Sequence, residues 1–510
     1  MTMGRRLLAL SVVVVSLTLM FHFSSLQSTL STSLSRMMSS SSSPASRVIV
    51  VGSGLAGLSA AHAALQRGVP VHLLDRAPKP GGNSIKASSG INGAGTPAQA
   101  AAGISDSPAA FAEDTVKSAG ERYRAPEQIV DRAALIRKLS AESAGAVGWL
   151  VDDIGVDLSV VAVLGGHSVP RTHRGGGKLP PGAAIVMGLL NKLKEHPNFT
   201  LSSGAEVTNL KVDGGAVKGV KYTHAGETAE LDGAVVFAAG GFAGDRALLA
   251  KHRPDLAGMP STNDERPGAH ALLANLGVPL LDMDRVQVHP TGFVDPANVT
   301  APIKFLAGEM LRGEGGILLG PDGKRFVNEL GTRAKVSGAI MGREPDASDD
   351  GTKQWATTIL LDPGASEAAK FHIGFYAFKG LLRKVRVSEL DAAVRASVDA
   401  YAAAVHGGAA DPFGRKSFGK WSYKPGDDAE VYIGQVTPVT HFTMGGAAID
   451  TGARVLRKDG AEMVPVPGIW AAGEITGGVH GDNRLGGSSL LECVVYGRTA
   501  GAAAAAGVKA

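Results

Sequence analysis

The segment between residues 48 and 75 constrains the fold of this chain more than any other. Four β-branched residues at 48–51 run directly into Gly-Ser-Gly-Leu-Ala-Gly at 52–57. A helical pattern of leucines follows and stops at Gly68, and a second apolar run ends at Asp75. Strand, glycine turn, helix, strand and acid in this order form the fingerprint of a dinucleotide-binding βαβ unit. The sequence therefore predicts an α/β fold built on a parallel sheet.

Each residue of the fingerprint has an expected task. Gly52 permits the tight turn, and Gly54 lets the backbone approach a pyrophosphate at the N-terminus of the helix. Gly57 allows the helix to pack closely on the strand, and Asp75 is placed to bind the ribose hydroxyls of an adenosine. The adjacent residues of the predicted cofactor site are Leu55, Ala56 and Arg76.

Later small-residue segments favour FAD over NAD as the cofactor. Loops of glycine and serine follow the second strand at 81–84 and 88–93, where they can lie along a pyrophosphate and a flavin ring. Two further buried-strand patterns end in glycines, at 235–242 and 468–474. Three strand-to-glycine segments suit a fold that encloses an elongated cofactor. The candidate contacts in these segments are Gly82, Asn83, Ser84, Ser89, Gly90, Ala239 and Gly240.

The composition excludes several other kinds of redox centre. The 510 residues include one cysteine, Cys493, so neither an intrachain disulfide nor a cysteine-based zinc or iron–sulfur site can form. No C-x-x-C-H haem motif occurs, and we expect no metal. The formal net charge of +4 is small for this length, which disfavours nucleic-acid binding and suits an anionic substrate. Redox chemistry here must use an organic cofactor.

Residues 1–46 are typical of a targeting or anchor segment. Two arginines at 5–6 precede an apolar run at 7–23, and the segment contains no acidic residue. We expect an endoplasmic reticulum signal or a membrane anchor, and membrane contact only through this segment. The alternative is a mitochondrial or other organelle transit peptide, because the segment is also rich in serine. A start at Met37 or Met38 would give a cytoplasmic form.

Together with motifs further along, these segments resemble the FAD-dependent fumarate reductases and succinate dehydrogenase flavoprotein subunits. The likeness extends from Arg47 to the C-terminus. It is strongest to the soluble fumarate reductases of eukaryotic microbes and to the flavin domain of bacterial flavocytochromes. The motifs that carry it are 52–57, His289-Pro290-Thr291, Arg325-Phe326-Val327-Asn328-Glu329, Thr332-Arg333, His441-Phe442-Thr443-Met444-Gly445-Gly446 and Asn483-Arg484-Leu485-Gly486-Gly487.

The resemblance implies a particular domain organisation. It is a Rossmann-like, three-layer FAD-binding domain with an inserted α+β substrate-capping domain. We expect the targeting segment at 1–46 and the first part of the FAD-binding domain at 47–282. The cap is expected at 283–440, and the chain then returns to the FAD-binding domain at 441–510.

Two histidines and an arginine are the implied substrate-binding residues. By resemblance, His289 holds one carboxylate of the substrate, while His441 and Arg484 hold the other. An arginine fork suits a carboxylate because it donates two parallel hydrogen bonds. His289 follows an apolar run and is expected at a strand end. His441 follows a run that contains Pro438, which predicts an edge strand or a strand start.

Arg333, Glu309 and Arg312 are the implied catalytic residues for FAD-dependent reduction of fumarate to succinate. By resemblance, a hydride comes from flavin N5, Arg333 delivers a proton to the substrate carbon, and Glu309 and Arg312 pass protons to Arg333. Arginine normally stays protonated, so an acid role requires a dry site with neighbouring cations. A simpler interpretation is that Arg333 only stabilises negative charge developing on the substrate.

Four more residues are assigned to the flavin. By resemblance, Glu474 contacts the ribityl or pyrophosphate region and Val207 contacts the adenine. Ser489 and Leu490 begin the C-terminal helix pattern. The N-terminus of that helix can stabilise negative charge on a reduced flavin.

The chain departs from the family's pattern at two places. Succinate dehydrogenase subunits attach FAD through a histidine in the loop after the Gly-Gly motif, and residues 83–95 contain no histidine. We therefore expect non-covalent FAD. In bacterial flavocytochromes a threonine precedes the glutamate of the substrate motif, and here that position is Gly308. One hydrogen bond to the substrate is then missing or supplied by the backbone.

Two other functions remain open at this stage. One is an FAD-dependent reductase or dehydrogenase of another substrate, such as urocanate, L-aspartate or a 3-ketosteroid, although a steroid would need an apolar cleft. The other is a non-catalytic flavoprotein, which would not need a carboxylate clamp. The sequence leaves the electron donor open among a free reduced flavin, NADH and a redox protein.

Overall fold

The computed structural model describes residues 47–126, 128–177, 179–347 and 351–509. Its central sheet has the strand order β21–β22–β10–β1–β2–β6. All neighbours from β22 to β6 are parallel, and β21 is antiparallel at the edge. The strands are β1 (Val48–Val51), β2 (Val71–Asp75), β6 (Phe199–Ser203), β10 (Ala234–Phe237), β21 (Arg454–Asp459) and β22 (Glu462–Ala471).

This sheet brings the three predicted strand-to-glycine segments together. β1, β10 and β22 are direct neighbours although they come from distant parts of the chain. In a parallel sheet the carboxyl ends of neighbouring strands meet at one edge, which is where open α/β sheets bind ligands. The predicted α/β, Rossmann-like architecture is confirmed.

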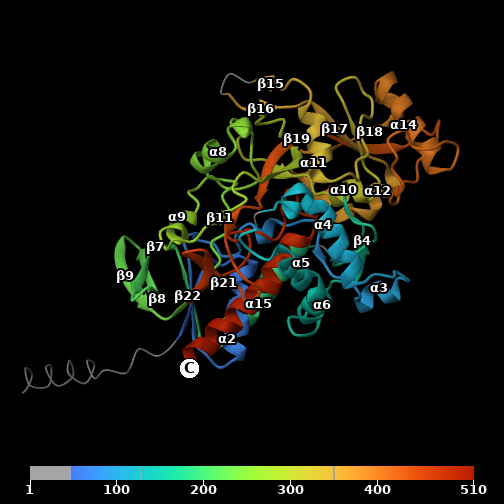
Figure 1. Ribbon diagram of the computed structural model, residues 1–510. Coiled ribbons are helices and arrows are strands. Elements are labelled where there is room, and N and C mark those ends of the chain that lie inside the picture. Colours follow the sequence, from blue (N-terminus) through green and yellow to red (C-terminus); the bar gives the residue numbers. More distant parts are fainter. Residues whose placement is uncertain (1–46, 127, 178, 348–350, 510) are drawn as a thin grey trace, which may run out of the picture. The chain divides into compact units, whose positions relative to one another are not determined.

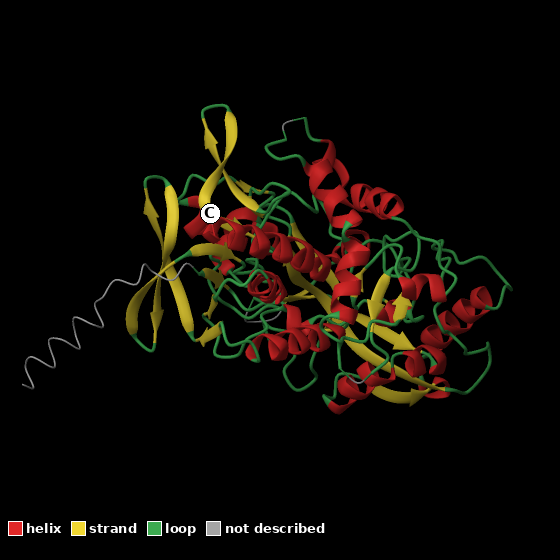
Figure 2. Ribbon diagram, turned by 90° about the horizontal axis from the view of Figure 1, so that it is seen from below, coloured by secondary structure: helices red, strands yellow, loops and turns green. Residues whose placement is uncertain are grey.

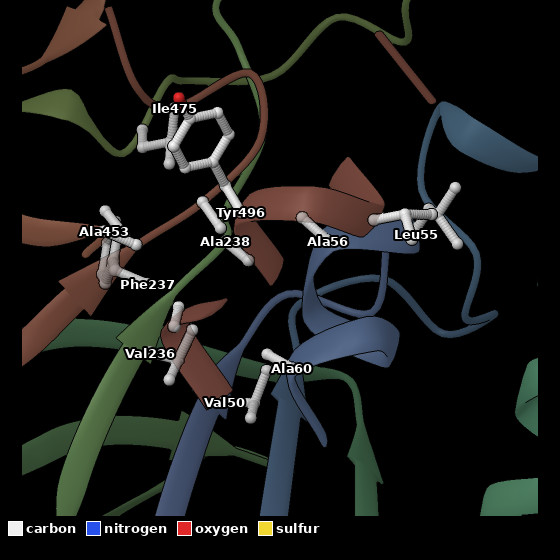
Figure 3. Close-up of a cluster of buried hydrophobic side chains, with 14 of the residues drawn as sticks. Val50, Leu55, Ala56, Ala60, Val236, Phe237, Ala238, Ala453, Ile475 and Tyr496 are labelled. Carbon is white, nitrogen blue, oxygen red and sulfur yellow. The ribbon is translucent and has the colours of Figure 1, made fainter. Parts of the chain in front are cut away.

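Two helices pack side by side on this sheet (Figure 1), namely α2 (Leu55–Gln66) and α15 (Ser488–Lys509). Their backbones come close because the contact residues are small. A Cβ at Gly497 would lie 2.5 Å from the Ala56 carbonyl oxygen, and one at Gly501 would lie 2.0 Å from that of Ala60. Figure 3 shows Ala60 of α2 among the apolar side chains of β1 and β10 below it. This packing places Gly497, in the middle of α15, beside the start of α2, so the N-terminus of α15 extends past the nucleotide fingerprint.

A second sheet is formed by strands from residues 286–443. Its order is β13–β12–β19–β17–β14, and β18 also pairs with β19. The strands are β12 (Val286–Phe293), β13 (Phe305–Leu306), β14 (Ile317–Leu319), β17 (Thr357–Leu361), β18 (Arg383–Arg386) and β19 (Glu430–Thr443). Its helices are α10 (Met310–Gly313), α11 (Arg333–Met341), α12 (Pro363–Ala368), α13 (Lys370–Phe378) and α14 (Ala392–Val405). Residues 47–510 pack as one compact unit, so the division into domains stays a prediction.

Two local expectations about this second sheet are wrong. His289 lies inside β12 rather than at its end, and Pro438 lies inside β19, which pairs with β12 and β17 and is not an edge strand. The register of β12 shifts between His289 and Gly292, opposite Pro438. The pairing of β19 with β17 ends at Val436, so the proline lies where a ladder hydrogen bond from its nitrogen is not needed.

The remaining elements surround these two sheets, and helices flank strands along the described chain (Figure 2). No helix in the described part is long and apolar enough to cross a membrane. The predicted targeting or anchor segment, residues 1–46, lies outside the described residues. The remaining helices are α3 (Pro97–Ala101), α4 (Pro108–Arg124), α5 (Arg132–Ala141), α6 (Ser143–Asp152), α7 (Pro181–Lys194), α8 (Arg246–His252) and α9 (His270–Ala274). The remaining strands are β3 (Ile91–Asn92), β4 (Val160–Ala162), β5 (Thr172–Arg174), β7 (Ala205–Asp213), β8 (Ala216–His224), β9 (Glu227–Asp232), β11 (Leu280–Leu281), β15 (Asp346–Ala347), β16 (Lys353–Gln354) and β20 (Gly446–Ala447).

Candidate active site

A first cavity of about 460 Å³, here called the nucleotide cavity, lies at the carboxyl ends of β1, β2 and β10. Helix α2 begins at its wall, where Leu55 N donates to Ser84 Oγ at 3.1 Å. The glycines are needed for close packing: a Cβ at Gly52 would lie 2.3 Å from the Ala238 carbonyl oxygen, and one at Gly57 would lie 1.9 Å from that of Gly52. The predicted residues that line this cavity are Gly52, Gly54, Leu55, Ala56, Asp75, Arg76, Gly82, Asn83, Ser84, Val207, Ala239, Gly240 and Glu474.

Asp75 has a structural task in addition to its place at the cavity wall. Its Oδ2 accepts hydrogen bonds from Ser53 N, at 2.7 Å, and from Ser53 Oγ, while its Oδ1 accepts from Ala77 N at 2.7 Å. The carboxylate therefore holds the glycine loop to the end of β2. Oδ1 accepts only this one hydrogen bond in the described chain and retains a second lone pair for a ligand, so the arrangement is compatible with the predicted ribose contact.

A second cavity of about 570 Å³, here called the inner cavity, adjoins the first and shares Asn83, Ser84, Glu474 and Cys493 with it. It extends between the flavin-side loops and the second sheet. The predicted residues that line it are Asn83, Ser84, Ser89, Gly90, Arg333, His441, Glu474, Arg484, Ser489 and Leu490. Gly57, His289, Glu309 and Arg312 line neither cavity and lie in the packed layer behind them.

Gln287 joins the two arginines of the inner cavity. Its Oε1 accepts a hydrogen bond from Arg333 Nη1 at 2.8 Å and another from Arg484 Nη2 at 2.8 Å. Its Nε2 donates to the Arg484 carbonyl oxygen at 2.7 Å. The guanidinium of Arg484 also lies over the Phe442 ring, 4.3 Å from its centroid. Two cations that would repel each other are therefore fixed on one neutral amide.

Glu309 is the carboxylate of this cluster. Its Oε2 accepts from Arg333 Nε at 2.7 Å, and its Oε1 accepts from Gly165 N at 2.8 Å. Burial would raise the pKa of Glu309, but the charges of Arg333 and Arg312 outweigh it and lower that pKa to about 2. Glu309 is therefore ionised at neutral pH.

Burial lowers the pKa of the two other arginines of the cluster, Arg312 and Arg484. Burial lowers the pKa of Arg312 to about 10, against the opposing charge of Glu309. Burial and the nearby charge of Arg333 lower the pKa of Arg484 to about 9. The lowered pKa of Arg484 indicates that no nearby carboxylate fully compensates the charge of its guanidinium. Such an uncompensated buried cation is typical of a site that binds an anionic ligand.

The two predicted histidines lie together, with ring centroids 5.3 Å apart. Burial, followed by the charge of Arg333, lowers the pKa of both His289 and His441 well below the usual value, so both imidazoles are neutral. His441 Nδ1 lies 3.0 Å from Thr262 Oγ1. The Nε2 of His289 is buried and has no hydrogen-bond partner among the described residues. A buried polar atom of this kind needs a ligand atom to complete it.

The structure thus brings all six residues predicted for substrate binding and catalysis into one region, and it adds Gln287. The sequence contained a signal for it: Gln287, His289 and Thr291 alternate along one strand, which puts three polar side chains on one side of a buried segment. A single glutamine in an apolar run does not indicate whether its side chain binds a ligand or hydrogen-bonds the backbone.

Glu474 and Cys493 lie where the two cavities meet. Burial raises the pKa of Glu474 to about 7, although Thr443 N donates to its Oε1 at 2.9 Å. Burial also raises the pKa of the Cys493 thiol, so this cysteine is not a thiolate at neutral pH. Glu474 is therefore only partly ionised at neutral pH, while the Cys493 thiol is uncharged.

The donor set and the shape of the two cavities fit an elongated dinucleotide. The backbone approaches the nucleotide cavity where Cβ atoms are missing, as at Gly240, which has a φ of 80° and open space within 4 Å of an added Cβ. Two helix N-termini, those of α2 and α15, supply partial positive charge at the two ends of this space. These features would hold phosphates at one end and an electron-accepting ring at the other.

Comparison with known proteins agrees with this site. Residues 47–490 match the model of an FAD binding domain family. The chain is 41% identical over 476 residues to fumarate reductase 1 of Saccharomyces cerevisiae, covering 89% of this chain and 97% of the relative. It is 36% identical over 472 residues to the fumarate reductase (cytochrome) of Shewanella frigidimarina, covering 90% of this chain and 76% of the relative.

Among solved structures, the open conformation of a flavocytochrome c3 fumarate reductase superposes with a TM-score of 0.69 at 31% identity, covering 94% of this chain and 81% of that chain. The chain therefore belongs to the fumarate reductase family of FAD-dependent oxidoreductases.

Proposed function

We propose that this chain reduces the double bond of fumarate to give succinate. The observation that carries the proposal is the pair Arg333 and Arg484, held on one Gln287 oxygen at the wall of the inner cavity. Glu309 is hydrogen-bonded to Arg333 and not to Arg484, so the cluster keeps an excess of buried positive charge. A small dicarboxylate would supply the missing anions, because arginine binds carboxylates in a bidentate way.

The substrate carboxylates would be held by residues at the wall of the inner cavity and directly behind it. Arg484 and His441, which line the cavity, would bind one carboxylate. His289, whose ring lies next to that of His441 in the layer behind the wall, would bind the other through Nε2, which has no partner in the described chain. Both imidazoles are neutral because burial lowers the pKa of each. They would therefore donate hydrogen bonds without adding to the charge that the arginines already provide.

The chain's own residues would handle the proton. When bound and reduced by the electron donor, FAD would supply a hydride, that is two electrons and one proton, to one carbon of the double bond. Arg333 would give a proton to the other carbon, since its guanidinium lines the cavity and is oriented by Glu309 and Gln287. Glu309, 2.7 Å from Arg333 Nε, would return a proton to it, and Arg312 would supply Glu309.

The alternatives differ in what they require of the cavity. A ketosteroid would need an apolar wall. The inner cavity has apolar residues such as Phe305 and Phe375, but it also contains two buried arginines whose charge a neutral steroid would leave unpaired. Urocanate and other unsaturated acids carry one carboxylate and would leave part of the charge cluster unpaired. A non-catalytic flavoprotein would have no need to bury these cations at a cost in desolvation.

The test uses the protein's own colour. The purified holoprotein is photoreduced under argon, and fumarate, urocanate or a monocarboxylic enoate is added. Return of the flavin absorbance with fumarate, faster than with the other acids, supports the proposal. Reduced flavin that stays bleached with fumarate would rule it out. A panel of free reduced flavin, NADH and small redox proteins then identifies the electron donor, which we leave open among these three classes.

We also propose that residues 1–46 direct the protein to the endoplasmic reticulum or anchor it in a membrane, with an organelle transit peptide as the alternative. The support is the arginine pair at 5–6, the apolar run at 7–23 and the absence of acidic residues in this segment. A chain started at Met37 or Met38 would lack the apolar run and stay in the cytoplasm.

A further inference from the structure

Ser88 is a buried hydroxyl at the wall of the inner cavity. Its side chain belongs to the loop that precedes β3, and the residue is 7% exposed. Its Oγ is buried and makes no hydrogen bond within the described chain. A buried hydroxyl without a partner is destabilising, so such a group at a cavity wall indicates a ligand atom that completes it.

Gly308, in the loop between β13 and α10, leaves room for this hydroxyl. A Cβ at Gly308 would lie 2.5 Å from Ser88 Oγ and 3.1 Å from Ser88 Cβ. Gly308 does not have a positive φ, so its backbone conformation would accept any residue. Glycine is required at this position because Ser88 Oγ fills the space that a side chain at 308 would take.

Helix α13 holds the Gly308 side of this contact. The Tyr376 hydroxyl donates to the Leu306 carbonyl oxygen at 2.9 Å and accepts from Gly308 N at 3.4 Å. One turn earlier on the same helix, His372 lines the inner cavity together with Ser88. The backbone around Gly308 is therefore held in place by a side chain of α13.

We propose that the Ser88 hydroxyl donates a hydrogen bond to a carboxylate oxygen of the substrate. It thereby supplies, from the flavin-side loop, the polar contact that a glycine at 308 cannot make. This inference rests on the proposed function, because it takes a dicarboxylate as the ligand of the inner cavity. Ser88 is a specificity-determining residue in this scheme: it adds affinity for the carboxylate and has no part in proton transfer.

The unpaired atoms around the site agree with this assignment. Besides Ser88 Oγ, the Nε2 of His289 and the Nε of Arg484 are buried without partners in the part of the chain that the structure describes. All three are able to donate, and a carboxylate offers about four acceptor positions. One bound dicarboxylate can therefore complete all three donors at once, which no single backbone adjustment could do.

The test compares three variants by single-turnover kinetics, which need no external electron donor. Each photoreduced holoenzyme is mixed with increasing fumarate, and flavin reoxidation gives a limiting rate and a half-saturating concentration. For Ser88→Ala we expect the half-saturating concentration to rise about tenfold, equivalent to about 1.4 kcal/mol. The limiting rate should stay within about threefold, because the contact is made equally in the ground and transition states.

A compensating variant makes the proposal specific. In Ser88→Ala/Gly308→Ser the removal of Oγ opens space for a hydroxyl carried by residue 308 close to the place that Ser88 Oγ occupied, and binding should recover to within about threefold of wild type. Gly308→Ser alone should bind fumarate more weakly, because its Cβ meets Ser88 Oγ. The matched control is Ser140→Ala, which removes another buried, unpaired hydroxyl, in α5 and outside both cavities, and should change neither parameter.

The outcomes separate this inference from the proposed function. If wild type reacts with fumarate but Ser88→Ala keeps its half-saturating concentration within about twofold, the Ser88 assignment is wrong and the function stands. A Ser88→Ala protein that loses FAD, with no recovery in the double variant, would also overturn the assignment, since Ser88 would then serve the cofactor loop. If the reduced wild-type protein fails to react with fumarate, both the proposed function and the Ser88 assignment are wrong.

Discussion

Arg333 Nε lies 2.7 Å from Glu309 Oε2, and both residues are buried. Arg333 is the first residue of α11, and Glu309 lies directly before α10, so the ends of two short helices meet at this pair. The contact fixes the guanidinium at the cavity wall. Glu309 is the only carboxylate hydrogen-bonded to this guanidinium in the described chain, and the contact fixes its position as well. Four of the predictions below depend on this cluster and its cofactor.

Replacing Arg333 tests proton delivery. If Arg333 acts as the acid in the transition state, Arg333→Ala should lower kcat and kcat/KM together, by on the order of a thousandfold or more, with FAD still bound. Arg333→Lys should recover little, because an ammonium lacks the fork that reaches Glu309 and Gln287 at once. Flavin content and melting temperature exclude misfolding. A variant that kept more than about a tenth of wild-type kcat, a loss under ~1.4 kcal/mol, would exclude Arg333 as the proton donor.

Arg484 should behave differently in the same assay. Its guanidinium is proposed to hold a carboxylate of the bound substrate, so Arg484→Ala should raise KM as well as lower kcat/KM. The reason is that a ground-state contact is lost along with any transition-state contact. Steady-state kinetics with fumarate would show this split. An unchanged KM in a folded, flavin-loaded variant would place the carboxylate elsewhere.

Replacing Glu309 should change the stability of the protein by an amount that depends on pH. Its folded-state pKa of about 2 lies below the ordinary 4.5, so ionised Glu309 stabilises the fold above pH ~4.5 and this contribution is lost as the pH falls toward 2. The shift corresponds to roughly 3 kcal/mol at neutral pH. In urea unfolding, Glu309→Gln should be less stable than wild type at pH 7, and the gap should narrow from pH ~4.5 downward. A gap independent of pH would show that the carboxylate is not charged in the fold.

FAD should be bound without a covalent bond, because residues 83–95 contain no histidine to attach it. Acid precipitation of the purified protein is therefore expected to leave a yellow supernatant and a colourless pellet. Yellow colour that stays in the washed pellet would contradict this.

Glu474, whose pKa burial raises to about 7, offers a related control. Glu474→Gln places a neutral side chain of the same shape at the cavity wall, so this variant should retain FAD.

Residues 1–46 are expected to carry targeting information. A fluorescent reporter fused after residue 46 should leave the cytosol, because the arginine pair and apolar run precede it. The matched control starts at Met38 and should remain diffuse. Cytosolic fluorescence from the full fusion would refute the proposal, and co-localisation with a mitochondrial marker would select the transit-peptide alternative.

Most of the fold could be predicted from local patterns. The run at 48–51, the glycines at 52–57 and the acid at Asp75 specify a strand, a turn and a helix through steric and hydrogen-bonding rules that act over a few residues. The same rules failed at Pro438, where a bulge in the neighbouring strand removed the need for a backbone donor. That bulge belongs to β12, and nothing in the residues around Pro438 encodes it.

The sequence by itself determined the cofactor-binding architecture and the residue types of the site, because glycine conformation, strand periodicity and charge are local properties of the chain. Only the tertiary structure decided that Gln287 bridges Arg333 and Arg484, and that Ser88 faces Gly308 across 220 residues of sequence. Those contacts depend on how the second sheet packs against the flavin-side loops. Such packing is a sum of many weak long-range contacts, and no short segment of sequence contains it.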